Sequence, residues 1–367
     1  MNKLPLRLTG VIMSLIIMLI SLSSCSGGEG GDSPADSSKS AFPEVMKVAL
    51  LASSESDVSY DGMKPIDVAN ELWEALRVYV SYSDISKCSV ERFDADNEKY
   101  TAAFNILYAE GYRYFVAYGS RFSEAIGEAQ SKYPDCKFVL FGDAPTDESG
   151  EPAISKNTIC VSFDVYSAAF LAGVYTASEL EKGTLGFIGG DETATANSYL
   201  RGFTDGLSYA KEQLGCKVTL SENMSVFIGD SSDIGSAQQL AAAMYDSGIT
   251  AVYCTSGDFS LGVISEAKAR SANGKPAFVI LSETYGRERG VYNEVDSVIL
   301  TSAYIDYAPA LEYAINSFLD GNFEGGRSLV FGVKETAAYA AFSNQETGAN
   351  TAANVETAKN YLENLLE

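Results

Sequence analysis

The residue types that most often perform enzyme chemistry are absent or scattered in this sequence. Histidine is missing, which removes the commonest general base, the commonest metal ligand and every pairing of a nucleophile with histidine. The phosphate-binding patterns GxxxxGK[ST] and GxGxxG are also missing. Carboxylates are plentiful, with 49 Asp and Glu, so a hydrolase that uses two carboxylates stays an alternative. We predict no enzyme activity, no catalytic residue, no metal and no cofactor.

Six cysteines occur, and none of them has CxxC spacing, so a zinc site is not expected. Cys136, Cys160 and Cys254 lie in apolar runs and are predicted to be small buried hydrophobic residues. Apart from Cys25, five cysteines remain, and an odd number cannot form a complete set of intramolecular disulfides.

The charge of the chain argues against nucleic acid as a partner. Lys and Arg number 26 against 49 acids, which gives a formal net charge of −23. Binding to a phosphate backbone requires a basic surface, and this composition does not provide one. The hydrophobic fraction of 46% is sufficient for sizeable cores, so the composition suits an exported and well-solvated globular protein.

The N-terminus has the pattern of a bacterial lipoprotein signal. Lys3 and Arg7 precede an apolar segment at 8–22, which is shorter than the roughly 20 residues that a spanning helix needs. Leu22-Ser23-Ser24-Cys25 resembles a lipobox. We predict a signal peptide at 1–24, a lipidated Cys25 and a flexible Gly- and Ser-rich tether over 25–43. The protein would then be lipid-anchored on the extracytoplasmic face of the cell membrane. An ordinary signal with an incidental cysteine is the alternative.

The remaining sequence alternates short apolar runs with amphipathic stretches. The runs are almost continuously apolar, which is typical of parallel strands buried on both faces. Repeated β-α units of this kind predict an α/β doubly wound fold, and the number of strands favours two Rossmann-like lobes. The predicted strands are 45–52, 112–119, 137–142, 158–163, 184–190, 250–257, 277–282, 297–304 and 328–333. The predicted helices are 66–81, 97–110, 121–132, 166–181, 195–214, 232–247, 259–272, 306–320 and 351–366.

Several segments resemble one known family. GTLGFIGGDETATANSYLRGFTDGL (183–207) is similar to the GKVGFVGGMD…RRFEAGFxxG stretch of the basic membrane protein family. SKYPDCKFVLFG (131–142), NTICVSFDVYSAAFLAGVYTA (157–177) and YDSGITAVYCTSGDFSLGVISEAK (245–268) resemble family segments in the same order. These proteins are substrate-binding lipoproteins of ABC transporters and include purine nucleoside receptors. The resemblance implies a type I periplasmic-binding-protein fold with parallel sheets. One lobe would contain 44–163 and 304–327, and the other 164–303 and 328–367.

The resemblance and the predicted strand ends together indicate where a ligand would bind. Ligands of such folds lie at the carboxyl ends of parallel strands. Asp191 falls on the acid of the family's GGMD, and Lys334 matches the lysine of its GLKD. For Asp191, capping of the following helix is the alternative, and for Tyr118 and Phe163 it is a role in the core. Phe259 opens a helix after a glycine, which favours exposure to the cleft. The predicted ligand-binding residues are Tyr60, Tyr118, Phe163, Asp191, Phe259, Glu283 and Lys334.

Several positions depart from the family pattern, among them the segment ILSETYG (280–286), which stands where the family has GVDSDQ. Ser53 replaces the leading acid of the family's first loop, and Ile305 replaces the lysine of its SMVKRVD segment. The predicted function is an extracytoplasmic solute-binding lipoprotein of an ABC importer that captures a nucleoside-like small molecule between two lobes. Its predicted partners are that ligand, an ABC permease and the membrane, the last through the lipid anchor only. A sensor that signals to a membrane partner is an alternative with the same fold.

Overall fold

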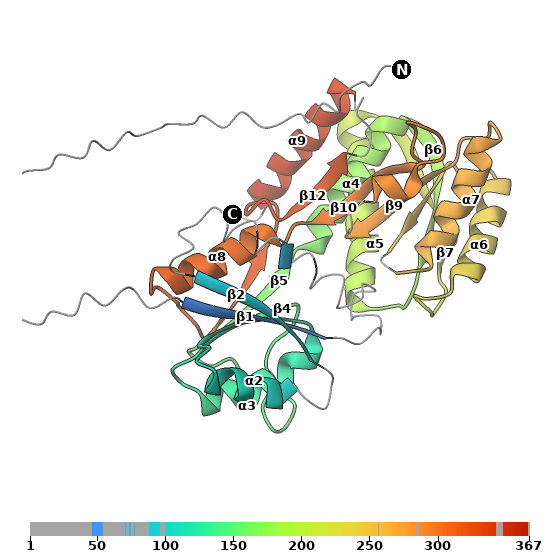
Figure 1. Cartoon of the computed structure of the whole chain (residues 1–367). Helices are drawn as coiled ribbons and strands as arrows, with labels where there is room; N and C mark the ends of the chain where they lie inside the picture. The colour runs from blue at the N-terminus through green and yellow to red at the C-terminus, as the bar shows by residue number, and fades with distance from the viewer. Residues whose placement is uncertain are drawn as a thin grey trace, which may run out of the picture. The chain divides into compact units, whose positions relative to one another are not determined.

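The computed structural model describes residues 46–53, 70, 73, 74, 77, 88–95, 100–255, 257–283, 286–342 and 348–365. Within these residues the chain forms two six-stranded sheets with helices packed on them (Figure 1). The predicted signal peptide, Cys25, the tether, Tyr60 and most of the predicted helix 66–81 lie outside the described residues.

The first sheet is entirely parallel and has the strand order β11-β5-β4-β3-β1-β2. Its strands are β1 (Met46–Ser53), β2 (Cys88–Ala95), β3 (Tyr114–Tyr118), β4 (Lys137–Phe141), β5 (Thr158–Phe163) and β11 (Arg327–Phe331). Its helices are α2 (Tyr100–Ala109), α3 (Ser123–Lys132) and α8 (Ala308–Leu319). Alternate residues of β1 enter different cores: Ala49 and Leu51 join the cluster with α2 and α3, whereas Val48 and Leu50 join the cluster with α8. Helices therefore cover both faces, which explains the continuous apolar runs.

The second sheet has the order β12-β10-β9-β8-β6-β7, and only β12 is antiparallel to its neighbour. Its strands are β6 (Lys182–Gly189), β7 (Lys217–Phe227), β8 (Ala251–Cys254), β9 (Phe278–Glu283), β10 (Ile299–Ile305) and β12 (Ala338–Phe342). The associated helices are α4 (Val165–Leu180), α5 (Ala194–Tyr209), α6 (Ile234–Asp246), α7 (Ser260–Ala272) and α9 (Ala349–Leu365). Ala251 and Tyr253 pack with α4 and α5, and Val252 and Cys254 pack with α6 and α7, so this sheet is also covered on both faces (Figure 1).

The chain passes between the two sheets three times: after β5, after β10 and after β11. Backbone hydrogen bonds join these crossing segments. The Asp164 amide donates to the Phe331 carbonyl at 2.9 Å, and the Asp306 amide donates to the Ala337 carbonyl at 2.8 Å. The α/β class and the two parallel sheets predicted from the apolar runs are therefore confirmed.

Three described strands were not predicted from sequence: β2, β7 and β12. Each lies at the edge of its sheet, where one side of the strand has no neighbour. Their sequences are correspondingly more polar or richer in alanine than the central runs; along β7, for example, few positions are fully buried. Edge strands do not need a continuous apolar run, so the pattern misses these three, although it did predict β11, which also lies at an edge.

One part of the predicted division into lobes is wrong. Residues 328–367 were assigned to the second lobe, but β11 pairs in parallel with β5 of the first sheet. The chain joins the second sheet only at Ala338, through β12. A short apolar run shows that a strand is present, whereas the sheet edge on which it pairs depends on contacts far along the chain.

The predicted helices from 97 onward agree with α2 to α9, and their ends differ by a few residues, the usual uncertainty of such boundaries. The largest difference is at 195–214, where α5 ends at Tyr209 and a short π-helical turn covers Ala210–Leu214. Across the described residues, no helix is both long and apolar enough to cross a membrane.

Candidate functional site

At the carboxyl end of the second sheet, one carboxylate joins two loops. The Ser231 hydroxyl donates to Asp191 Oδ2 at 2.6 Å, and the backbone amide of Asp191 donates to the Ser231 hydroxyl oxygen at 3.0 Å. Asp191 follows β6 and is exposed, whereas Ser231 follows β7 and is only 3% exposed. The pair therefore fixes the β6–α5 loop against the β7–α6 loop, with the carboxylate at the surface. No sequence signal had identified Ser231, because its partner lies 40 residues away.

Asp191 does not cap helix α5, so the alternative considered for it is contradicted. Thr193 is the N-cap residue, and its hydroxyl accepts the Ala196 amide at 3.0 Å. A helix needs one such side chain to satisfy an amide of its first turn. The Asp191 carboxylate is thus engaged with Ser231 and remains partly open to solvent, where a ligand could meet it.

The loops at this edge pack so closely that two positions require glycine. A Cβ on Gly190 would lie 2.3 Å from the Ser231 hydroxyl oxygen. Gly257 has φ +144°, and a Cβ there would lie 2.8 Å from both the Phe259 ring and the Ser231 carbonyl oxygen. The Gly190 amide also donates to the Thr255 hydroxyl at 3.2 Å. The loops after β6, β7 and β8 therefore form one tightly packed unit around Ser231.

Phe259 supports this unit from within and does not present its ring to solvent. Its side chain is 0% exposed and belongs to the core formed with Cys254, Val263 and Ile264. Its amide donates to the Ser231 carbonyl at 3.1 Å. The expectation that Phe259 faces the cleft is corrected by this burial, because its backbone opens α7 while its side chain turns into the sheet–helix core.

At the carboxyl end of the first sheet, an aromatic cluster joins three strands to a crossing segment. The ring centroids of Phe163 and Tyr307 are 4.9 Å apart in an edge arrangement, and those of Tyr118 and Tyr307 are 6.2 Å apart. The ring centroid of Phe331 lies 6.4 Å from that of Phe163. Tyr118 is 5% exposed and acts mainly as a core residue, whereas Phe163 is half-buried. The structure brings these two predicted residues together through Tyr307, which sequence analysis did not select.

The other predicted residues are not brought into one cluster. Glu283 ends β9, but its side chain lies outside the described part of the structure. The neighbouring Ser282 is buried, and its hydroxyl lies 2.9 Å from the Tyr253 hydroxyl. Lys334 is exposed in the crossing segment between β11 and β12. Beside it, the Glu335 carboxylate accepts the Gly332 amide at 2.9 Å and so shapes the turn.

Negative charge dominates the loops at the carboxyl edge of the second sheet. Segments 190–193, 228–233 and 306–307 contain acids and no Lys or Arg. Hydrogen bonds from the Ser232 hydroxyl and amide lower the pKa of Asp230, and those from Ser236 lower the pKa of Asp233. These carboxylates therefore stay ionised at neutral pH. Such an edge accepts hydrogen bonds from hydroxyl and amino groups and repels anions.

Cys136, Cys160 and Cys254 are buried free thiols, as predicted. Burial raises the pKa of Cys136 to about 12 and that of Cys160 to about 11, and it raises the pKa of Cys254 as well. A thiol must ionise to act as a nucleophile or metal ligand, so these thiols stay protonated and unreactive at neutral pH. Among the described residues, no three His, Cys, Asp or Glu side chains come together in a way that could hold a metal ion.

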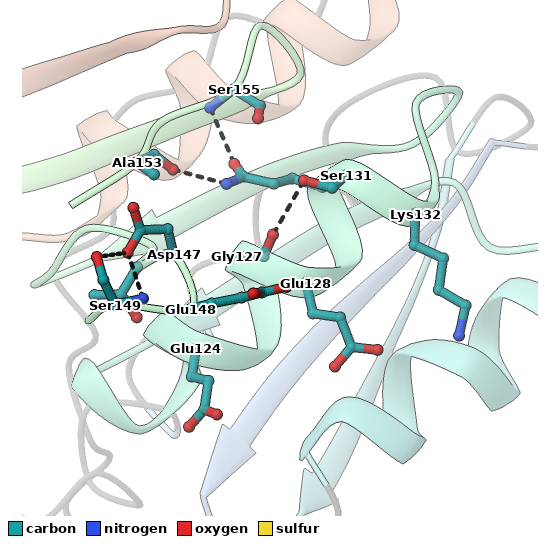
Figure 2. A pocket seen from close by; sticks show the side chains of 12 residues that line it. Glu124, Gly127, Glu128, Ser131, Lys132, Asp147, Glu148, Ser149, Ala153 and Ser155 are labelled. Atoms are coloured by element: carbon teal, nitrogen blue, oxygen red, sulfur yellow. Dashed lines mark hydrogen bonds between the residues drawn. The ribbon is translucent and has the colours of Figure 1, made fainter. Parts of the chain in front are cut away.

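A polar pocket of about 920 Å³ lies elsewhere, between α3 and the loop that follows β4 (Figure 2). Several of its polar groups bind one another. Gln130 donates to the Ala153 carbonyl and accepts from Ser155, and Asp147 accepts the Ser149 hydroxyl at 2.6 Å. None of the predicted ligand-binding residues lines this pocket. We therefore attribute it to the packing of a loop on α3 and place the candidate site at the strand ends.

Comparison with known proteins adds a family. The sequence profile of the Bmp family, described as "ABC transporter substrate-binding protein PnrA-like", matches residues 66–357. The ABC transporter nucleoside-binding protein BmpA of Lactococcus lactis subsp. cremoris is 25% identical over 333 residues, covering 88% of this chain and 89% of that protein. Basic membrane protein A1 of Borrelia garinii subsp. bavariensis is 25% identical over 342 residues, covering 91% of this chain and 86% of that protein.

Solved structures show the same fold. A solute-binding protein of an ABC transporter system from Conexibacter woesei matches with a TM-score of 0.65 and 17% identity, over 88% of this chain and 98% of that one. A transcriptional activator of the comK gene from Bacillus halodurans matches with a TM-score of 0.65 and 17% identity, over 86% and 96% of the two chains. Identities this low establish the architecture alone, and that architecture is the type I periplasmic-binding-protein fold expected from the sequence.

Proposed function

The chain belongs to the Bmp family of PnrA-like ABC transporter substrate-binding proteins, and we propose that it captures a nucleoside-like small molecule for an ABC permease. The observation that carries the proposal is the family match, which extends over residues 66–357 and so includes strands of both sheets. The polar and aromatic loops at the carboxyl ends of these strands supply the kind of surface on which ligands of such folds bind.

A nucleoside suits the chemistry of this edge. Its ribose hydroxyls and exocyclic amines donate hydrogen bonds, and the second sheet ends in exposed carboxylates, including Asp191. A free phosphate would meet repulsion from the same acids. The Lactococcus relative is described as nucleoside-binding, which supports the same ligand class. We propose Asp191 as a ligand contact, with Tyr60, Phe163, Glu283 and Lys334 as further predicted contacts.

Calorimetry on ligand-stripped protein tests the ligand class. Adenosine, guanosine and inosine are titrated separately, and the corresponding 5′-monophosphates serve as matched anionic controls. We expect heat with at least one nucleoside and at least tenfold weaker binding of its monophosphate. Bound ligand should also raise the melting temperature, because a hundredfold excess over Kd stabilises the folded state by about 2.7 kcal/mol. Absence of binding by all three nucleosides would refute the assignment. Mass spectrometry of small molecules released from protein purified from cells would then identify the ligand.

Anchoring at the extracytoplasmic face of the cell membrane is a second part of the proposal. It depends on the signal-like segment 1–24 and the lipobox at Cys25. Cells fed a labelled fatty acid should incorporate label into the wild-type protein and into Cys216→Ala but not into Cys25→Ala. Label in Cys25→Ala equal to that of the wild type would show that the lipid is attached elsewhere.

We also propose that the ligand leaves unchanged, since the chain lacks histidine and its buried thiols are held protonated. Incubation of each nucleoside with the purified protein, followed by chromatography, should return the intact nucleoside. Release of free base with turnover proportional to protein concentration would favour the carboxylate-based hydrolase instead.

A further inference from the structure

Two tyrosines form an aromatic surface on the second sheet. Tyr304 lies on β10 and Tyr339 lies directly opposite it on β12 in the antiparallel register. Their ring centroids are 5.0 Å apart, and the ring planes are inclined by 52°. Side chains of directly opposed residues share a face of a sheet, so both rings lie on the same side.

This surface lies at the edge of the sheet where the candidate site is located. Tyr304 is the penultimate residue of β10, and Ile305 ends that strand. Because β12 is antiparallel, its first residue, Ala338, pairs with Ile305, and Tyr339 follows. Both rings therefore lie at the carboxyl end of the parallel strands, as do the loops that carry Asp191 and Ser231.

The exposure of Tyr339 distinguishes it from the other aromatic residues at the strand ends. Within the described part of the chain, two aromatic side chains are exposed: Tyr339 at 37% and Tyr361 at 43%. Tyr361 lies on α9, where it packs against Phe170 and Tyr209. Phe259, by contrast, is fully buried. Among the described residues, Tyr339 is thus the exposed aromatic residue at the carboxyl edge of the second sheet.

The chemistry of the pair suits an uncharged ring. Partial burial, together with the nearby Tyr304 and Asp306, raises the pKa of the Tyr339 phenol. The phenol therefore keeps its proton at neutral pH, and the uncharged ring offers a π-face. Such a face matches the flat faces of a nucleobase.

We propose that Tyr304 and Tyr339 form the aromatic surface on which the base of the ligand stacks, with Tyr339 as the residue in direct contact. The inference rests on the proposed function, since it assigns a binding surface to the nucleoside. The base would then lie against the edge strand β12, in contact with the Tyr339 ring. Tyr304 would support that ring from its other side. The alternative is a cross-strand pair that only stabilises the attachment of β12 to β10.

Calorimetry on the ligand-stripped full chain separates these roles. The ligands are adenosine, guanosine and inosine, together with ribose, galactose and arabinose. Tyr339→Ala should raise the Kd of the bound nucleoside about tenfold, within the range of roughly 5- to 150-fold that base–aromatic stacking provides. Tyr339→Phe keeps the ring and should stay within about threefold of the wild type. Tyr361→Ala removes an equally exposed tyrosine on α9 and should leave Kd unchanged.

A second variant and a stability measurement distinguish a loss of ligand binding from a loss of folded protein. Tyr304→Phe should preserve binding, and each variant's urea midpoint is measured without ligand. If Tyr339→Ala binds like the wild type while its urea midpoint falls, the pair is a structural contact and the inference is overturned. If the wild type binds a sugar and no nucleoside, both the nucleoside proposal and the inference fail, since a sugar has no base to stack. Binding of none of the six ligands overturns both.

Discussion

Replacing Phe259 with alanine should destabilise the protein strongly without weakening the binding of the ligand. The ring is 0% exposed and packs with Val263 and Ile264, so its removal leaves a cavity lined by apolar side chains. Truncation of a buried phenylalanine to alanine costs about 3–5 kcal/mol in the free energy of unfolding. The backbone bond from the residue 259 amide to the Ser231 carbonyl does not need the ring and should persist. The loop that holds Asp191 would therefore keep its shape in the folded fraction.

Urea denaturation followed by circular dichroism measures the free energy of unfolding, and calorimetry below the unfolding transition measures the Kd of the ligand. Leu261→Ala is the matched control, because Leu261 lies on the same helix but is 37% exposed. It should change the free energy of unfolding by at most about 0.5 kcal/mol. Phe259→Ala should keep the ligand Kd within about twofold of the wild type. A loss of less than 1 kcal/mol in stability, combined with a tenfold rise in Kd, would refute the assignment of Phe259 to the core.

Four further predictions concern a helix cap, a side-chain hydrogen bond, a charge and two thiols. Thr193→Ala should lower the free energy of unfolding by about 1 kcal/mol, because α5 loses its cap, and an unchanged urea midpoint would contradict the capping assignment. Asp191→Ala should lower the free energy of unfolding by a similar amount, because the hydrogen bond to Ser231 is lost. The folded-state pKa of Asp233 is lowered, so its contribution to stability is present above the unfolded pKa of about 3.9 and is lost as pH falls through the folded pKa. Asp233→Asn should therefore reduce the dependence of the urea midpoint on pH below about 4, and an unchanged acid profile would contradict this. Cys136 and Cys160 should not react with a thiol reagent at pH 8 until urea unfolds the chain, whereas rapid labelling of the native protein would show that they are accessible.

For the candidate site, sequence analysis located the edge of the sheets more accurately than the side chains. Asp191 follows a predicted strand and is exposed as a binding residue should be, yet the structure assigns its carboxylate to Ser231 and the helix cap to Thr193. Phe259 was expected at the surface because a glycine precedes it, but the direction of its side chain depends on the helix–sheet core below. Tyr307 and Tyr339 were not selected, because one tyrosine among 22 has no local signal of its position.

Local patterns determined the α/β class, the central strands and nearly all the described helices. An apolar run buried by helices on both faces, or a polar-capped amphipathic stretch, is encoded within ten to twenty neighbouring residues. Tertiary structure alone decided that β11 joins the first sheet, that β2, β7 and β12 form edges, and that Asp191 meets Ser231. Each of these depends on contacts between residues far apart in sequence, whose partners are chosen by the packing of the whole fold. The proposed ligand-facing surface depends mainly on such contacts, so it is the part of this protein that the sequence alone describes least.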